Sequence, residues 1–221
     1  MIVYQSKKSQ VKLVKLDNKL RIIKTSFNRP DALNEIKMLQ SINHKHITQL
    51  LQVLDTKTDS YVITTFPYYS RGDLFDRIHK YKMQLDVKQI MRQLLSATTY
   101  LHERDIAHMD IKPENIMFDA KDNVILIDFD LACFTSEYTS RIKGTSEYLP
   151  PEHKIHEKRD PKKQDIWCVG IVCYEMIFRN VTPPLRIEKV KEPHLRMFLK
   201  HALEPDPWQR ATAHELLELL S

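Results

Sequence analysis

The pattern of apolar residues changes about a third of the way along the chain, and this change most constrains the fold. Before residue 66 the apolar residues fall in short alternating stretches, such as Val11, Leu13 and Leu16, which is typical of half-buried β-strands. After a break at residues 67–72 they recur at helical spacing, so that one face of residues 87–101 is apolar. The sequence therefore predicts a small strand-rich lobe followed by a larger helical lobe.

Individual elements can be placed within these lobes. Residues 2–24 hold apolar stretches separated by a turn at Asp17-Asn18, which predicts two or three antiparallel strands, and Pro30-Asp31 opens a helix. The other expected strands cover residues 47–54, 60–66, 116–118 and 124–127, and the other helices cover residues 87–101, 165–178, 193–203 and 211–220. A chain of 221 residues suits one domain, residues 1–221, with an N-lobe at 1–66 and a C-lobe at 67–221.

Composition excludes several classes of protein. Only 3 of 221 residues are glycine, which argues against collagen-like and linker sequences and counts against a glycine-rich phosphate loop. The net charge is +5, but the basic residues are not interleaved with aromatic ones, so we expect no nucleic-acid binding. The cysteines match no metal-ligand spacing, residues 1–10 lack a signal-peptide pattern, and no apolar run is long enough to span a membrane. We expect a cytoplasmic or nuclear protein without a membrane anchor.

Three polar motifs in the second lobe point to phosphate chemistry. They are HMDIKPEN at residues 108–115, DFD at residues 128–130 and GTSEYLPPE at residues 144–152. Transfer of a phosphoryl group depends on positioning and on neutralising charge. A carboxylate such as Asp110 orients an attacking hydroxyl group, and Lys112 can reach the transferring phosphate. Taken alone, such a run could equally be a polar turn; the complete set of motifs disfavours that interpretation.

In this order and spacing, the motifs resemble those of the eukaryotic protein kinase family, H-R-D-x-K-P-x-N, D-F-G and A-P-E. The resemblance covers about residues 2–220 and implies an α+β, bilobal protein-kinase-like fold. That fold has a small antiparallel β-sheet N-lobe and a mainly helical C-lobe. The implied activity is that of a Ser/Thr protein kinase, which transfers the γ-phosphate of ATP to protein hydroxyl groups with Asp110 as base. We expect a monomer that acts on protein substrates.

The resemblance also assigns the residues that handle ATP and Mg²⁺. Asp110, Lys112 and Asn115 would be catalytic. Asn115 and Asp128 would bind the metal, because amide and carboxylate oxygens are the hard ligands that Mg²⁺ takes. Lys24, at the end of the run RIIK, would pair with the nucleotide phosphates.

In the small lobe, Glu35 would hold Lys24 in place. The alternative is that Lys24 is a solvated strand charge and Glu35 an acid on a helix surface. Phe66 would be the gatekeeper beside the adenine, and Tyr68 would lie in the hinge between the lobes.

The nucleotide-covering loop departs from the family pattern. If Val11 aligns with the valine of G-x-G-x-x-G-x-V, then Tyr4, Ser6 and Ser9 stand where the family has glycine. Ser6, Ser9 and Val11 would still border the phosphates, but side chains restrict the close approach of backbone N–H groups. We therefore expect weaker ATP binding or a more open loop.

Other residues have structural roles in the family. Glu152 would pair with Arg210, Asp165 would bind the backbone near His108, and Thr145 would hydrogen-bond Asp110. An apolar spine across both lobes would be formed by Leu39, Leu50, His108 and Phe129.

Three further departures bear on regulation. Met109 replaces the arginine that clamps a phosphorylated activation loop, so we expect activity to be independent of phosphorylation there, at Thr135, Ser136, Thr139 or Ser140. Asp130 replaces the glycine of D-F-G and adds charge close to the metal site. The segment between Phe178 and His194 is too short for the helix that the family usually carries there. We expect a minimal kinase domain.

Two other functions remain open from the sequence. The missing glycines, Met109 and Asp130 would also suit a pseudokinase or decoy, a binding module that regulates another kinase or its substrate. A small-molecule kinase is disfavoured, because residues 144–152 resemble the protein-directed branch of the family. Within that branch, residues 72–76 and 110–115 look most like calcium/calmodulin-kinase-like or cell-cycle Ser/Thr groups.

Overall fold

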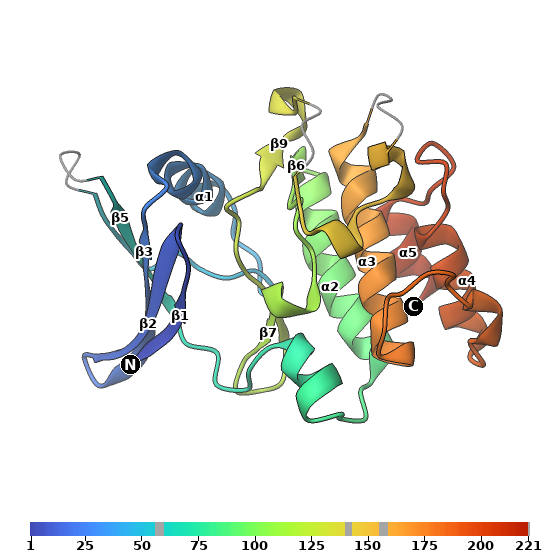
Figure 1. The fold of residues 1–221 in the computed structure, drawn as a ribbon, viewed down its shortest axis with the longest axis horizontal. Helices are drawn as coiled ribbons and strands as arrows, with labels where there is room; N and C mark the ends of the chain where they lie inside the picture. Colours follow the sequence, from blue (N-terminus) through green and yellow to red (C-terminus); the bar gives the residue numbers. More distant parts are fainter. Residues whose placement is uncertain (56–59, 140–142, 155–158, 221) are drawn as a thin grey trace.

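The N-terminal part of the chain is a twisted antiparallel sheet with one helix beside it (Figure 1). The computed structural model describes residues 1–55, 60–139, 143–154 and 159–220. The strand order in the sheet is β1-β2-β3-β5-β4. Its elements are β1 (Ile2–Gln5), β2 (Ser9–Leu16), β3 (Lys19–Ser26), β4 (Gln52–Leu54), β5 (Val62–Pro67) and the helix α1 (Arg29–Ser41).

Local sequence explains the start of this lobe. Asp17 and Asn18 both have positive φ, at 47° and 60°, which is the backbone of a tight two-residue hairpin turn and confirms the predicted turn. The side chain of Asn28 accepts a hydrogen bond from the N–H of Asp31 and caps α1, and Pro30 occupies its first turn. The helix therefore begins where the sequence predicted it.

The C-terminal part is mainly helical. Its longer helices are α2 (Val87–His102), α3 (Pro161–Phe178), α4 (Pro193–Ala202) and α5 (Ala213–Leu219), and a π-helical turn η1 covers Asp76–Lys80. Short strands form two pairs, β6 (Ile106–Ala107) with β9 (Cys133–Phe134) and β7 (Ile116–Phe118) with β8 (Val124–Leu126). The 3₁₀ turns are η2 (Pro113–Asn115), η3 (Thr135–Glu137), η4 (Ser146–Tyr148), η5 (Pro151–Lys154) and η6 (Ile187–Lys189).

Two predicted elements were wrong in extent. The strand expected at residues 47–54 is reduced to β4, because the residues before it pair with the other lobe. Ile47 bridges Leu126, and the N–H of Thr48 donates to the carbonyl of Leu126 over 2.9 Å. The helix α3 begins at Pro161 and not at residue 165, since the Asp160 side chain caps it.

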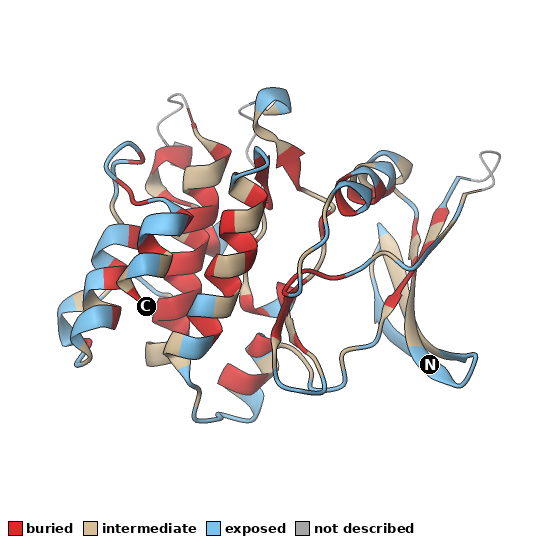
Figure 2. Cartoon of the chain, turned by 180° about the vertical axis from the view of Figure 1, so that it is seen from behind, coloured by how far each residue is buried: buried red, intermediate tan, exposed pale blue. Residues whose placement is uncertain are grey.

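The core of the C-lobe surrounds α3, which is buried on almost every side (Figure 2). Gly170 in this helix lies so close to Leu203 that an added Cβ would come within 2.6 Å of a methyl carbon. The absence of a side chain at Gly170 therefore lets α3 lie tightly against the end of α4. Within the described residues, no helix is both long and apolar enough to cross a bilayer.

Candidate active site

The loop that carries Asp110 is held in place by a fully buried carboxylate on α3. Asp165 on α3 accepts hydrogen bonds from the N–H groups of His108 and Met109, each over 2.8 Å, and contacts the His102 ring at 3.0 Å. The His108 ring contacts the carbonyl of Ile127 at 3.0 Å. A buried carboxylate requires such partners. Asp165 therefore holds the backbone in front of Asp110, as the resemblance implied.

The carboxylate of Asp110 is held by three neighbouring side chains. Thr145 donates to Oδ1 from its hydroxyl over 2.8 Å and from its backbone N–H over 3.0 Å. Lys112 Nζ lies 2.8 Å from Oδ2, and Asn115 Nδ2 donates to the same oxygen over 3.2 Å. The expected contact of Thr145 with Asp110 is thus present. The contact of Lys112 Nζ with Thr145 Oγ1, at 2.7 Å, was not foreseen.

Asn115 and Asp128 offer oxygen atoms of the kind that a hard cation needs. The amide nitrogen of Asn115 donates to Asp110 Oδ2 and, over 2.9 Å, to the Asp110 carbonyl, so the amide oxygen is the atom that could ligate a cation. The N–H of Ile127 donates to the carbonyl of Asn115 over 3.0 Å, which brings the two segments together. This donor set fits Mg²⁺.

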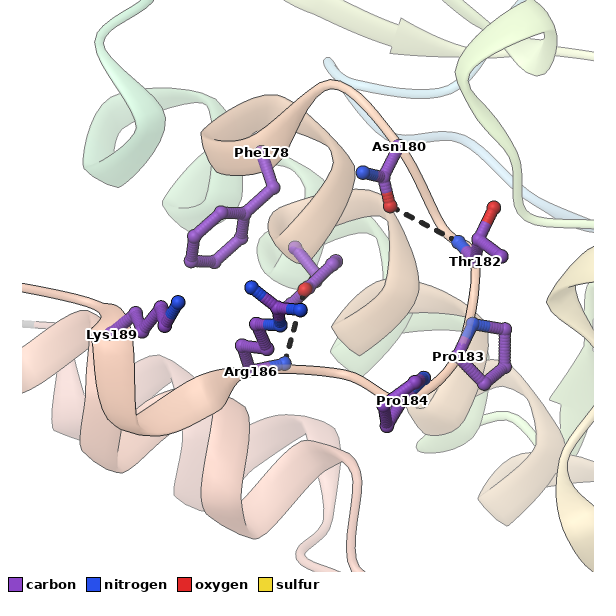
Figure 3. A pocket seen from close by; sticks show the side chains of 8 residues that line it. Phe178, Asn180, Thr182, Pro183, Pro184, Arg186 and Lys189 are labelled. Carbon is purple, nitrogen blue, oxygen red and sulfur yellow. Dashed lines mark hydrogen bonds between the residues drawn. The ribbon is translucent and has the colours of Figure 1, made fainter.

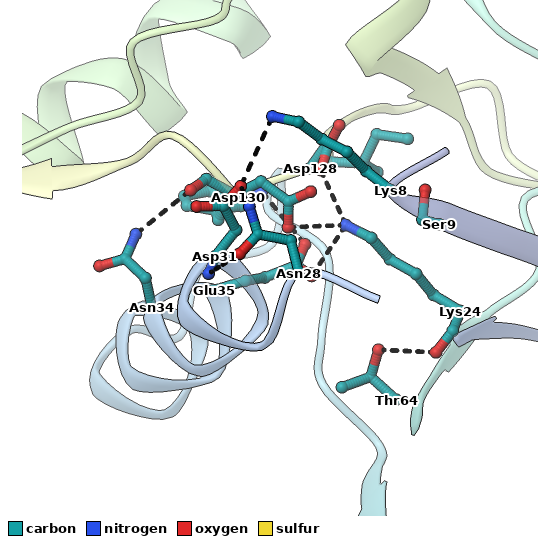
Figure 4. Close-up of polar contacts among 12 residues, drawn as sticks. Lys8, Ser9, Lys24, Asn28, Asp31, Asn34, Glu35, Thr64, Asp128 and Asp130 are labelled. Atoms are coloured by element: carbon teal, nitrogen blue, oxygen red, sulfur yellow. Dashed lines mark hydrogen bonds and ion pairs between the residues drawn. The ribbon is translucent and has the colours of Figure 1, made fainter. Parts of the chain in front are cut away.

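Lys24 lies at the centre of a cluster of three carboxylates (Figure 4). It projects from β3 and is only 8% exposed. Its Nζ lies 2.9 Å from Glu35 on α1, 3.0 Å from Asp128 and 2.8 Å from Asp130. Glu35 also accepts the N–H of Phe129 over 3.2 Å. Lys24 and Glu35 thus form the expected pair, and the alternative of a solvated lysine and a surface acid is wrong.

Burial and mutual charge shift the pKa values in this cluster. Burial raises the pKa of Glu35 to about 8, although the ammonium of Lys24 lowers it. Burial and the nearby charge of Asp128 likewise raise the pKa of Asp130. Burial also raises the pKa of Asp128, but the charge of Lys24 lowers it more, so that this pKa lies below its ordinary value. Glu35 and Asp130 are therefore the carboxyl groups for which the negative charge is least favourable.

A bidentate ion pair holds the end of the activation segment, the stretch between Asp128 and Glu152. Arg210 contacts Glu152 at 2.8 Å and 2.9 Å through its two terminal nitrogens, and both side chains are buried. The guanidinium of Arg210 also lies 5.0 Å from the centre of a Trp167 ring. This is the pair that the resemblance implied.

The protein kinase domain family matches residues 2–219. The chain belongs to the protein kinase family. It is 30% identical to the calcium/calmodulin-dependent protein kinase cmkA of Emericella nidulans, over 86% of this chain and 52% of that protein. It is 27% identical to the CBL-interacting serine/threonine-protein kinase 21 of Arabidopsis thaliana, over 92% of this chain and 53% of that protein. The chain thus spans about half the length of these relatives.

The loop that was expected to cover phosphate is a hairpin closed by a serine. The hydroxyl of Ser6 accepts the N–H groups of Lys8 and Ser9, each over 3.1 Å, and the N–H of Ser6 donates to the carbonyl of Ser9 over 2.8 Å. In the family pattern, backbone N–H groups of this loop fold over phosphate. Here two of them are bound by Ser6. Val11 follows on β2 and pairs with Lys24 on β3.

The kinase's expected adenine neighbours lie at the end of β5. Phe66 is buried and pairs with Ile22, and Tyr68 is exposed just beyond the strand. The four spine residues contribute to one core: Leu39 and Phe129 are buried within it, Leu50 packs against it, and the His108 ring lies 4.7 Å from the ring of Phe129. These four side chains thus connect the two lobes of the kinase.

Met109, at the position where the family motif has arginine, points into the interior of the C-lobe. Its side chain is fully buried in a small cluster with Ala107 and Cys133. An apolar contact therefore replaces the charged group. Of the candidate phosphorylation sites, Ser140 lies outside the described residues, and Thr135 and Ser136 lie in η3.

Sequence reasoning missed Asn34, which precedes Glu35 on α1. Its amide nitrogen donates to the carbonyl of Ala132 over 2.7 Å and to that of Asp130 over 3.4 Å. Asn34 thereby attaches the segment after Asp130 to α1. An amide beside the predicted lysine-binding glutamate was the only sequence signal for this contact.

A separate cavity lies at the far end of α3 (Figure 3). Its volume is about 460 Å³, and it is lined by Tyr174, Phe178, Asn180, Thr182, Pro183, Pro184, Arg186 and Lys189. Between Phe178 and Pro193 the only helical element is the 3₁₀ turn η6, so the expected shortening of this segment is confirmed. None of the predicted site residues lines this cavity.

Proposed function

We propose that this chain acts as a Ser/Thr protein kinase that transfers the γ-phosphoryl group of ATP to hydroxyl groups of proteins. The arrangement around Asp110 carries the proposal. Its carboxylate is oriented by Thr145 at 2.8 Å and lies beside a cation, Lys112, also at 2.8 Å. A phosphoryl-transfer site needs this combination of a fixed proton acceptor and a neighbouring positive charge.

Each residue near Asp110 has a defined part in the reaction. Asp110 orients the substrate hydroxyl and accepts its proton as the new phosphorus–oxygen bond forms and the bond from the γ-phosphorus to the bridging oxygen breaks, so that ADP leaves. Lys112 neutralises charge that develops on the transferred group. Asn115 holds the Asp110 backbone carbonyl and would also bind Mg²⁺ together with Asp128. Mg²⁺, when bound, neutralises the phosphate oxygens.

The nucleotide is assigned to the face between the lobes. Lys24, oriented by Glu35 at 2.9 Å, would hold its phosphates. Ser6, Ser9 and Val11 would border them from the hairpin, and Phe66 and Tyr68 would border the adenine. We further propose that residues 1–66 and 67–221 act as one monomeric kinase domain.

Phosphate transfer by the purified chain tests this function. The protein would be incubated with Mg²⁺ and labelled ATP against generic protein substrates, beside Asp110→Asn and Lys24→Met. Glu103→Gln, which neutralises an exposed acid at the end of α2, serves as the matched control. We expect transfer in the native chain and the control and its loss in both site variants. No transfer, together with no ATP-induced rise in melting temperature, would contradict the proposal and leave the pseudokinase or decoy alternative.

A further inference from the structure

The ammonium group of Lys24 is saturated by carboxylates. An ammonium has three N–H donors, and three carboxylate oxygens lie within hydrogen-bond distance of this one. The distances are 2.9 Å to Glu35, 3.0 Å to Asp128 and 2.8 Å to Asp130. All three donors are therefore used by residues of the chain itself. A phosphate group can bind this ammonium only if one carboxylate moves away.

Glu35 and Asp128 are not the carboxylates that would yield. The Glu35 side chain is 2% exposed and also accepts the N–H of Phe129, so it has no room to turn outward. Asp128 is the carboxylate assigned to Mg²⁺ and must remain near the phosphates. Asp130 is 30% exposed, against 39% for Asp128, and its carboxylate lies close to Glu35 as well as to Lys24, but it is not one of the two residues assigned to Mg²⁺.

The side chain of Asp130 can move while its backbone stays in place. Asn34 holds the segment through the carbonyl groups of Asp130 and Ala132, and not through the Asp130 carboxylate. The side chain can therefore rotate toward solvent while the turn stays attached to α1. In the family motif a glycine stands at this position and no such carboxylate exists.

We propose that Asp130 competes with the nucleotide phosphates for Lys24, so that ATP reaches this ammonium only after the Asp130 carboxylate has turned away. The inference rests on the proposed function. The apparent affinity for ATP is the intrinsic affinity multiplied by the fraction of molecules in which Asp130 is already displaced, and repulsion between the Asp130 charge and the phosphates lowers it further. Removing this carboxylate should tighten ATP binding about tenfold.

Calorimetric binding of ATP and of adenosine tests the competition. Adenosine carries no phosphate, so its affinity should be the same in the native chain and in Asp130→Gly. ATP should bind about tenfold more tightly to Asp130→Gly and to Asp130→Asn, with and without Mg²⁺. The Asn variant keeps the size of the side chain without the charge. Asp130→Glu, which retains a carboxylate, should stay close to the native affinity, as should the control Glu103→Gln.

Two results would overturn the inference. One is equal ATP affinity in the native chain, Asp130→Gly and Asp130→Asn, with thermal unfolding showing that each is folded. The other is a tightening that is as large for adenosine as for ATP, which would place the effect on the adenine side. Absence of ATP binding by the native chain and every variant would instead contradict the proposed function, and the inference would fail with it.

Discussion

The Asp110 side and the Lys24 side of the active site are built differently. Around Asp110, each partner donates to a carboxylate whose supporting loop is bound by Asp165 in the interior of the C-lobe. Around Lys24, one cation faces three carboxylates, and the nearby hairpin satisfies its own N–H groups through Ser6. Proton transfer depends on the position of one side chain, whereas phosphate binding depends on how many donors are free. The chain holds the Asp110 carboxylate in a fixed position, but it leaves few N–H donors free to bind phosphate around Lys24.

The strongest test of this contrast is Asp110→Asn. The amide cannot accept the hydroxyl proton, so the rate of phosphate transfer should fall by about 10² to 10⁴-fold. ATP affinity should stay within about twofold, because the Lys24 cluster is untouched. Transfer assays and calorimetry on the same preparation give both numbers. A large loss of ATP affinity would show that the two sides are not separable.

The stability of the C-lobe, which supports Asp110, can be tested with Arg210→Met. This change leaves the Glu152 carboxylate buried without its partner, which should cost about 3–5 kcal/mol of unfolding free energy. Urea denaturation measures the loss. The double variant Glu152→Met with Arg210→Met removes both charges and should recover part of the stability. A double variant no more stable than Arg210→Met would speak against the buried pair as the cause.

The restriction on the Lys24 side can be relaxed at the hairpin. Ser6→Gly with Ser9→Gly removes the hydroxyl that binds the two loop N–H groups, so ATP affinity should rise by a few fold. Ser6→Ala removes the same acceptor without adding backbone freedom and should give part of the gain. Calorimetry with ATP is the measurement. An unchanged affinity in both variants would mean that residues 4–9 do not approach the phosphates.

The smallest expected effect concerns the activation segment. Met109 is buried among apolar side chains and offers no charge to a phosphate on Thr135, Ser136 or Thr139. Phosphatase treatment should therefore leave the rate of transfer unchanged. Mass spectrometry would verify that the phosphate has been removed. Loss of activity after treatment would contradict this expectation.

The contacts that the sequence predicted are those that the resemblance to the protein kinase family implies. Asp110 with Thr145 and Glu152 with Arg210 were foreseen because the family assigns both members of each pair. The pairing of Asp130 with Lys24 was not foreseen, since it depends on how closely the two lobes approach.

The same reason explains the strand prediction that failed. The sequence of residues 47–54 predicted a strand, but not that Ile47 would pair with Leu126 in the other lobe. Local pattern predicts which residues are covered, while the identity of the covering element comes from the assembled fold.

The position of Arg210 above Trp167 gives the kinase a built-in fluorescent probe. The chain has two tryptophans, and Trp208 is 62% exposed. Trp208→Phe would leave a single indole, whose ring lies 5.0 Å from the guanidinium that binds Glu152. The emission of that indole would then report whether the ion pair between Arg210 and Glu152 is intact, in real time and without an added label.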